Sequence, residues 1–200
     1  MYLLNAQNLL RKGEVDDDVD ALLNSFFACL DRIPPLEAAP LLAAAWGVYG
    51  NQQLNIWGIS KDAADLHTAR TYFGRAQAVA EHYQIMDLIL QSRHSLAQCV
   101  WFEGDSERAR ALFLKVAANA QASGYILIEL NARHNAAGIL LCMENIADAL
   151  PEVHAVKRGY EKLGGHPNLD KINILLSTLE QDGQQEKLSS CHATSETEDI

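Results

Sequence analysis

The chain has 200 residues, and 48% of them are hydrophobic, so one compact domain or a short repeat array can bury a core. Its formal net charge is −10 with no basic stripe, which argues against generic binding to nucleic acid or to an anionic membrane. No apolar run approaches the roughly 20 residues that cross a bilayer, and no signal-peptide pattern stands at the start, so we expect a cytoplasmic protein.

The first expected helix pair covers about residues 2–31. A short helix over residues 2–11 ends at Lys12-Gly13, and Asp16-Asp17-Asp18 then supplies a cap and acid for the next helix. The acidic run lacks the Gly and the distal Glu of a calcium loop. In the second helix apolar residues recur at steps of three and four, which indicates one buried face. These residues are Val19, Leu22, Leu23, Phe26, Phe27 and Leu30.

Three further pairs are expected at about residues 40–82, 85–122 and 125–163. Pro40 is expected to open the first of them, because its missing N–H is not needed in a first turn. Gly and Asp punctuate the later helix ends, while Pro151 could kink the last helix or move its start. A capping helix over 168–181 and a disordered acidic tail over 182–200 follow. No segment alternates with period two, so the chain reads as all-α.

Some residues recur at a fixed spacing of 40. Ala69, Ala109 and Ala149 share this register on the second helices, and Arg93-His94 and Arg133-His134 share it on the first helices. A fixed period of this size indicates stacked helical hairpins.

The best-formed repeat spans residues 90–116. It places a small residue, Ala97, in its first helix, has a Gly104-Asp105 turn, and sets Ala109 four residues before Phe113. This pattern resembles a tetratricopeptide repeat, and the long period is similar to that of modules in bacterial signalling regulators and peptide receptors. The resemblance implies a right-handed α-solenoid of antiparallel helix pairs within one domain over residues 1–181.

In this family the first helix of each pair lines a concave groove. Asn and Gln side chains offer donors and an acceptor, so a ladder of them can hold the backbone of an extended peptide, and Trp101 could anchor it. The resemblance selects Asn51, Leu54, Asn55 and Gly58 in one helix, Gln91, His94, Ser95, Gln98 and Trp101 in the next, and Asn131, His134, Asn135, Gly138 and Leu141 in the third.

The Arg–His register allows two interpretations. Arg93 and Arg133 could bind a carboxylate at the groove, or they could pair with acids such as Glu103, Glu107 or Glu129 and support the stack. His94 and His134 could face the groove or make structural hydrogen bonds, and without a third ligand in register we expect no metal site.

The cysteines show no zinc spacing. Cys29, Cys99 and Cys142 lie in apolar helical patterns and are expected to be reduced, buried and inert, whereas Cys191 lies in the polar tail.

We expect a non-catalytic adaptor that binds a protein or peptide segment in this groove and uses no cofactor. One alternative is a self-associating module, in which the solenoid ends or the Ala-rich segment Leu41–Trp46 form a homodimer. A second alternative is an enzyme on a helical scaffold, although no Gly-rich phosphate loop, Gly-x-Ser-x-Gly or His-Glu-x-x-His motif is present. The acidic tail could also fold back over the side that carries Arg93 and Arg133.

Overall fold

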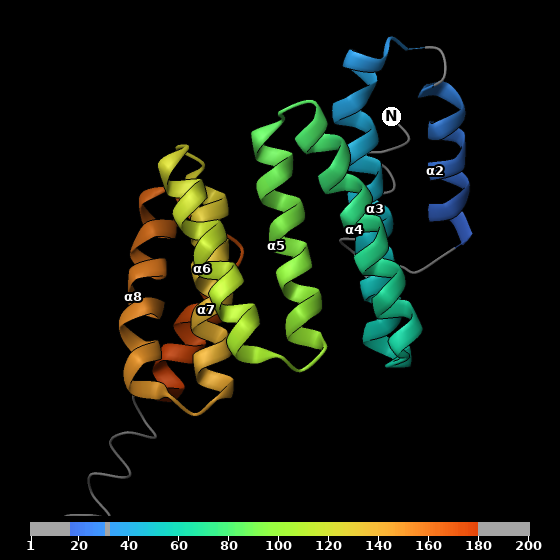
Figure 1. Cartoon of the computed structure of the whole chain (residues 1–200). Coiled ribbons are helices and arrows are strands. Elements are labelled where there is room, and N and C mark those ends of the chain that lie inside the picture. The colour runs from blue at the N-terminus through green and yellow to red at the C-terminus, as the bar shows by residue number, and fades with distance from the viewer. Residues whose placement is uncertain (1–16, 31–32, 180–200) are drawn as a thin grey trace, which may run out of the picture. The chain divides into compact units, whose positions relative to one another are not determined.

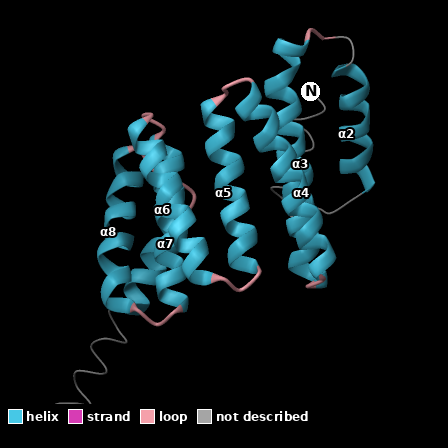
Figure 2. Cartoon of the chain, in the orientation of Figure 1, coloured by secondary structure: helices cyan, strands magenta, loops and turns pink. Residues whose placement is uncertain are grey.

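The computed structural model describes residues 17–30 and 33–179, and every regular element in these ranges is an α-helix (Figures 1 and 2). The all-α prediction is therefore confirmed for the described residues, whereas the handedness of a solenoid stays a prediction. The expected helix over residues 2–11 and the acidic tail over 182–200 lie outside the described residues.

The helices follow the expected order along the chain. They are α2 (Asp17–Leu30), α3 (Pro35–Ser60), α4 (Ala63–His82), α5 (Met86–Phe102), α6 (Ser106–Ala122), α7 (Ile126–Cys142) and α8 (Ile146–Lys162). A last helix covers residues 169–179.

The chain divides into two compact units, Met1–Ala132 and Arg133–Ile200, so the division falls inside α7. In the first unit, α3 packs against α4, α4 against α5 and α5 against α6 (Figure 1).

The start of α3 differs from the expectation. The helix begins at Pro35 rather than at Pro40, and Pro40 lies inside it. Pro35 occupies the first turn, where its missing N–H is not needed, and the Pro34 carbonyl accepts hydrogen bonds from Glu37 N and Ala38 N at 3.0 and 2.9 Å. Because a stable first turn already exists upstream, the helix tolerates the one backbone hydrogen bond that Pro40 cannot donate.

Short polar side chains begin the second helices. The Asp62 carboxylate accepts a hydrogen bond from Ala64 N at 2.9 Å, and the Asp105 carboxylate accepts one from Arg108 N at 3.2 Å. In the second unit, the Asn145 side chain accepts from Asp148 N at 3.3 Å. These caps satisfy N–H groups that have no partner inside their helices. After the Asn145 cap, α8 continues without interruption through Pro151, so the proline does not end this helix.

The residues of the 40-residue register occupy equivalent buried positions. Ala69, Ala109 and Ala149 are each 0% exposed, and the residues four positions later, Phe73 and Phe113 in the first unit, are also buried. Small side chains at helix contacts allow the helix axes to approach closely. The register is therefore a packing pattern within α4, α6 and α8.

α3 and α4 approach each other closely at Gly50. This glycine is buried, and a methyl group on its α-carbon would overlap the ring of Phe73. Phe73 belongs to a core cluster with Leu66, Ala69 and Cys99, which joins α4 to α5. A glycine is needed at this point because α3 has no room for a side chain.

A second core cluster lies nearer the start of α3. Ala43 packs with Ala80 and Ile89, and Ala45 is also buried. These two alanines of the Leu41–Trp46 segment therefore pack inside the first unit.

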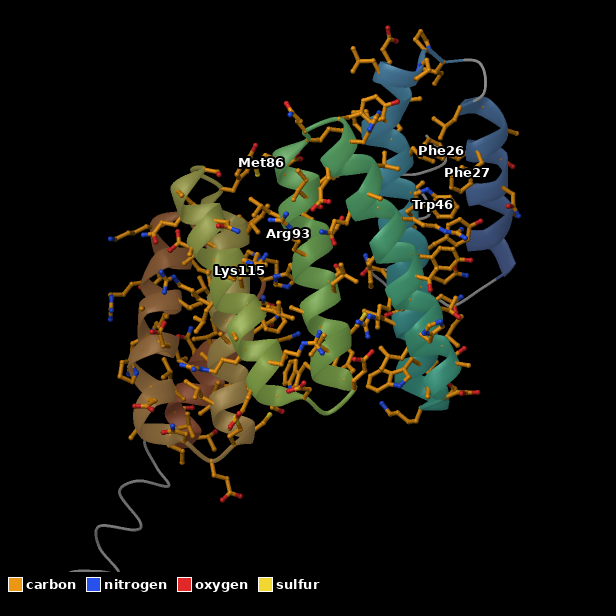
Figure 3. The ribbon with its side chains drawn as sticks, in the orientation of Figure 1. Phe26, Phe27, Trp46, Met86, Arg93 and Lys115 are labelled. Carbon is orange, nitrogen blue, oxygen red and sulfur yellow. The ribbon has the colours of Figure 1, made fainter. Side chains whose placement is uncertain are left out.

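Aromatic rings join α2 to α3. The ring of Phe27 lies 4.9 Å from that of Trp46 (Figure 3) and 5.9 Å from that of Tyr49. Tyr72 of α4 stacks on the rings of Trp46 and Tyr49. The Arg75 guanidinium lies 4.9 Å from the Trp46 ring centre. Aromatic packing of this kind supports the core role that we expected for Phe27.

In the second unit, the last helix covers apolar surface. Ile172 and Leu176 are buried, and Ile172 and Leu175 line a small apolar cavity of about 30 Å³ together with Val153 and Val156 of α8. Tyr160 is fully buried and stacks on His166 at 4.3 Å.

The cysteines differ in part from the expectation. Cys99 is buried, and burial raises the pKa of its thiol to about 12. Cys29 and Cys142 are exposed, so the prediction that all three are buried is wrong. Both lie near the C-terminal ends of their helices, and the apolar pattern of the sequence does not show that neighbouring helices leave these ends uncovered.

Candidate functional site

A cavity of about 560 Å³ lies between α3 and α5 in the first unit. We call it the α3–α5 cavity. Seven of the predicted groove residues line it, and four of these carry amide side chains: Asn51 and Asn55 from α3, and Gln91 and Gln98 from α5. The hydroxyl groups of Ser92 and Ser95 and the apolar side chains of Val48, Leu54, Trp57, Phe73, Leu88 and Phe102 complete most of the wall. None of its lining residues carries a charge.

Helical periodicity places the polar side chains of α5 on one face. Gln91, Ser95, Gln98 and Phe102 follow one another at steps of four, three and four residues, and residues at these spacings share a helix face. Leu90 and Ala97, on other faces of the helix, are fully buried. The packing of α5 against its neighbours therefore leaves the amide-bearing face toward the cavity.

Two glycines of α3 widen the cavity. Gly47 and Gly58 both line it, and a side-chain carbon added at either position would meet no other atom within 4 Å. Unlike Gly50, these residues are not required by a close helix contact, so their effect is to leave open space above the backbone of α3.

A row of aromatic rings stands at the end of the cavity where α3 and α5 end. Trp57 stacks on Phe102 at 4.5 Å, and Phe102 stacks on Trp101 at 5.8 Å. The Lys61 ammonium lies 4.5 Å from the centre of the Trp57 ring. Trp101 does not line the cavity itself, but it supports Phe102, which does.

Arg93 lies outside this cavity. Its Nη2 donates a hydrogen bond to Glu81 Oε1 at 2.9 Å, and Gln77 Nε2 donates to the same oxygen at 2.7 Å. The hydrogen bond from Gln77, followed by that from Arg93, lowers the pKa of the Glu81 carboxyl. Arg93 thus pairs with an acid, as one interpretation expected, although the partner is Glu81 and not Glu103, which pairs with Arg70 at 2.9 Å.

His94 also lies outside the α3–α5 cavity. Its ring packs edge-on against Phe113 of α6, with 5.1 Å between the ring centres. Burial lowers the pKa of His94 to about 4, so the imidazole is neutral near pH 7. This contact joins α5 to α6 inside the first unit.

The predicted binding residues of α7 do not line the α3–α5 cavity. In the second unit, Arg133 pairs with Glu152 at 3.8 Å, and His134 lines the small apolar cavity described above. Burial, followed by the charges of His166 and Lys171, lowers the pKa of His134.

Asn131 and Asn135 are half-buried on α7, one on each side of the division in the sequence. Their role in binding stays a prediction.

Sequence reasoning missed several residues of the cavity wall, and two of them, Trp57 and Phe102, are large aromatic residues. Phe102 could have been found, because it continues the face that carries Gln91, Ser95 and Gln98 by one more turn. No sequence signal shows that the ring of Trp57 on α3 stacks on Phe102 of α5. Within the described ranges, no group of three or more His, Cys, Asp or Glu side chains is placed to hold a metal ion.

The described chain is an all-helical protein in which an uncharged, amide-lined cavity separates two helices of the first unit. No protein-family model matches the chain, and no curated protein or solved structure matches it significantly. No helix among the described residues is both long enough and apolar enough to cross a membrane.

Proposed function

We propose that this chain is a non-catalytic adaptor that binds an uncharged stretch of peptide in the α3–α5 cavity, on a scaffold of the tetratricopeptide type. The observation that carries the proposal is the pair of facing helices whose amide side chains, Asn51 and Asn55 on one and Gln91 and Gln98 on the other, line a single cavity. Aromatic rings of Trp57 and Phe102 contribute to the wall of the same cavity.

The chemistry of the wall suits a peptide backbone. Each amide side chain offers two N–H donors and one carbonyl acceptor, which complement the alternating carbonyl and N–H groups of an extended chain. The volume of about 560 Å³ lies within the roughly 300–1,000 Å³ typical of ligand pockets. A charged side chain would lose its water here without gaining an ionic partner from the wall, so an uncharged segment is favoured.

The aromatic end supplies an anchor. Trp57 and Phe102 present stacked rings to the cavity, and large aromatic surfaces contribute strongly to binding when they become fully buried. An apolar side chain of the peptide would pack there, while its backbone would contact the amides farther along α3 and α5.

The wall offers little for catalysis. Ser92 and Ser95 are its only hydroxyl-bearing residues, and no histidine, cysteine or carboxylate lines it beside them. A serine hydroxyl needs an adjacent base to become a useful nucleophile. This composition supports a binding role.

The proposal is tested by substituting glycines of the cavity wall with a larger residue. Peptides would be selected from a random heptapeptide library on the immobilised chain, and their affinities would be measured by titration calorimetry. Gly47→Leu and Gly58→Leu place side chains in the open space, and each should weaken the selected peptides at least tenfold. Gly74→Leu is the matched control, because its added carbon also meets nothing within 4 Å and it does not line the cavity.

Circular dichroism would confirm that the variants remain folded. Peptides that bind the wild type, the cavity variants and the Gly74→Leu control with equal affinity would contradict the proposal. A library that yields no peptide would contradict it as well.

A further inference from the structure

A second, separate cavity of about 340 Å³ lies on the first unit among α4, α5 and α6, and we call it the α4–α6 cavity. Leu96, Leu112 and Val116 form its apolar floor. Arg93 of α5 and Lys115 of α6 stand at its rim (Figure 3), and the amides of Gln77 and Asn119 complete the wall.

This cavity uses the opposite face of α5 from the α3–α5 cavity. Each residue of an α-helix turns by about 100°, so Arg93 and Leu96 project on the side away from Gln91, Ser95 and Gln98. The two cavities share no lining residue. An occupant of one therefore leaves the other open.

The apolar floor is only partly covered by the chain itself. Val116 is 3% exposed, whereas Leu96 and Leu112 are half-buried and present apolar surface to solvent. An apolar side chain placed on Leu96 and Leu112 would remove that surface from water, which favours binding.

The two rim cations lie on neighbouring helices, and the first of them, Arg93, is held by an acid. Glu81 accepts hydrogen bonds from both Gln77 and Arg93, which orients the guanidinium, and this contact uses one of its five N–H donors. Lys115 lies on the neighbouring helix and forms no ion pair with any residue of the described ranges. Glu81 offsets the charge of Arg93, so the rim offers the ammonium of Lys115 and the remaining N–H donors of Arg93 to an anionic group beside the apolar floor.

We infer that the α4–α6 cavity binds a peptide segment in which an apolar side chain stands next to a carboxylate-bearing residue. The apolar side chain packs on Leu96 and Leu112, and the carboxylate lies between the rim cations. A peptide is favoured over a fatty acid because the Gln77 carbonyl and the Asn119 amide can bond to a backbone, for which an acyl chain has no equivalent. This site does not depend on the function proposed for the α3–α5 cavity.

The test uses ¹⁵N-labelled full chain and two blocked tripeptides. Acetyl-Asp-Leu-Glu-amide carries the proposed chemistry, and acetyl-Asn-Leu-Gln-amide is its neutral counterpart of nearly equal shape. The acidic peptide should shift the side-chain NH₂ signals of Gln77 and Asn119 and the backbone signals of Leu112, Lys115 and Val116. The neutral peptide should bind at least fivefold more weakly, and higher salt should weaken the acidic peptide alone.

Two variants locate the two parts of the site. Lys115→Met should weaken the acidic peptide about two- to fivefold, as expected for loss of one exposed ionic contact, and Leu112→Ala should weaken both peptides. Arg108→Met, on the same helix and outside the cavity, is the matched control and should leave binding unchanged. Gly47→Leu should also leave this binding unchanged, which separates the inference from the proposed function.

Three results would overturn the inference. The first is equal affinity for the acidic and neutral peptides, and the second is a set of shifted signals that lies away from α4, α5 and α6. The third is binding of laurate, but of neither peptide, to the same residues, which would identify the cavity as a site for acyl carboxylates.

Discussion

Substituting Gly50 with Ala should destabilise the first unit, although alanine is the better helix former. A methyl group at this position would overlap the ring of Phe73, and that ring is 1% exposed, so it cannot swing into solvent. Gly47 stands one turn earlier in the same helix, and a methyl group there would meet nothing within 4 Å. The two glycines therefore form a matched pair that differs in its contact with α4.

The expected magnitudes follow from two opposing effects. Replacing a helical glycine by alanine stabilises by about 0.5–1 kcal/mol, because the unfolded chain loses conformational freedom. Gly47→Ala should raise the free energy of unfolding by that amount. Overfilling a packed core costs about 1–3 kcal/mol. The free energy of unfolding of Gly50→Ala should thus be about 1–3 kcal/mol lower than that of Gly47→Ala, since the gain in helix propensity is common to both variants and cancels in the difference.

Tryptophan fluorescence during urea unfolding measures this difference in the free energy of unfolding for the first unit. All three tryptophans, Trp46, Trp57 and Trp101, belong to the first unit, so the signal reports its unfolding. The free energies come from linear extrapolation, with equal slopes required for the variants that are compared. If Gly50→Ala proves as stable as Gly47→Ala, the close approach of α3 to α4 at this point is wrong.

A double-mutant cycle checks the cause. Phe73→Leu removes the ring that the new methyl group would meet, so Gly50→Ala should be much less harmful in that background. A coupling energy of about 1 kcal/mol or more is expected for residues in direct contact. Additive effects would mean that Gly50→Ala acts somewhere other than on Phe73.

Three further outcomes are expected. As the pH falls from 6.5 to about 4, His94 should lower the free energy of unfolding by up to about 3 kcal/mol, because the imidazole is protonated in the unfolded chain before it is protonated in the folded chain. In urea unfolding, the free energy of unfolding of His94→Gln should depend less on pH than that of the wild type, and an equal dependence would refute this. Pro151→Ala should stabilise α8 by about 1–3 kcal/mol, and an unchanged thermal midpoint by circular dichroism would contradict it. Iodoacetamide should modify Cys142 well before Cys99, as read by mass spectrometry, and the reverse order would show that the buried thiol is accessible.

Part of the candidate site was predictable from spacing along the chain. Asn51, Asn55, Gln91 and Gln98 were expected to share a groove, and the structure places all four around one cavity. They lie together because residues that recur every three or four positions share a helix face, whatever the neighbouring helix is. That they bind a peptide stays a prediction.

The Arg–His register shows the opposite case. Arg93 and His94 are adjacent in sequence, and each could have faced the groove or supported the stack. In the structure Arg93 pairs with Glu81 of α4, and His94 packs on Phe113 of α6. Neighbouring residues on a helix point about 100° apart, so one register can serve two different interfaces. Only the positions of α4 and α6 reveal which interface each residue joins.

By itself the sequence determined that the chain is helical, where most of its helices begin, and that alanines such as Ala69 and Ala109 lie at helix contacts. Capping, glycine and proline placement and the apolar period act over a few residues, so they can be read locally. The tertiary structure decided that Gly50 marks a close contact whereas Gly47 opens a cavity, and that Trp57 meets Phe102. Those outcomes depend on atoms brought together from distant parts of the chain, and no local pattern contains them.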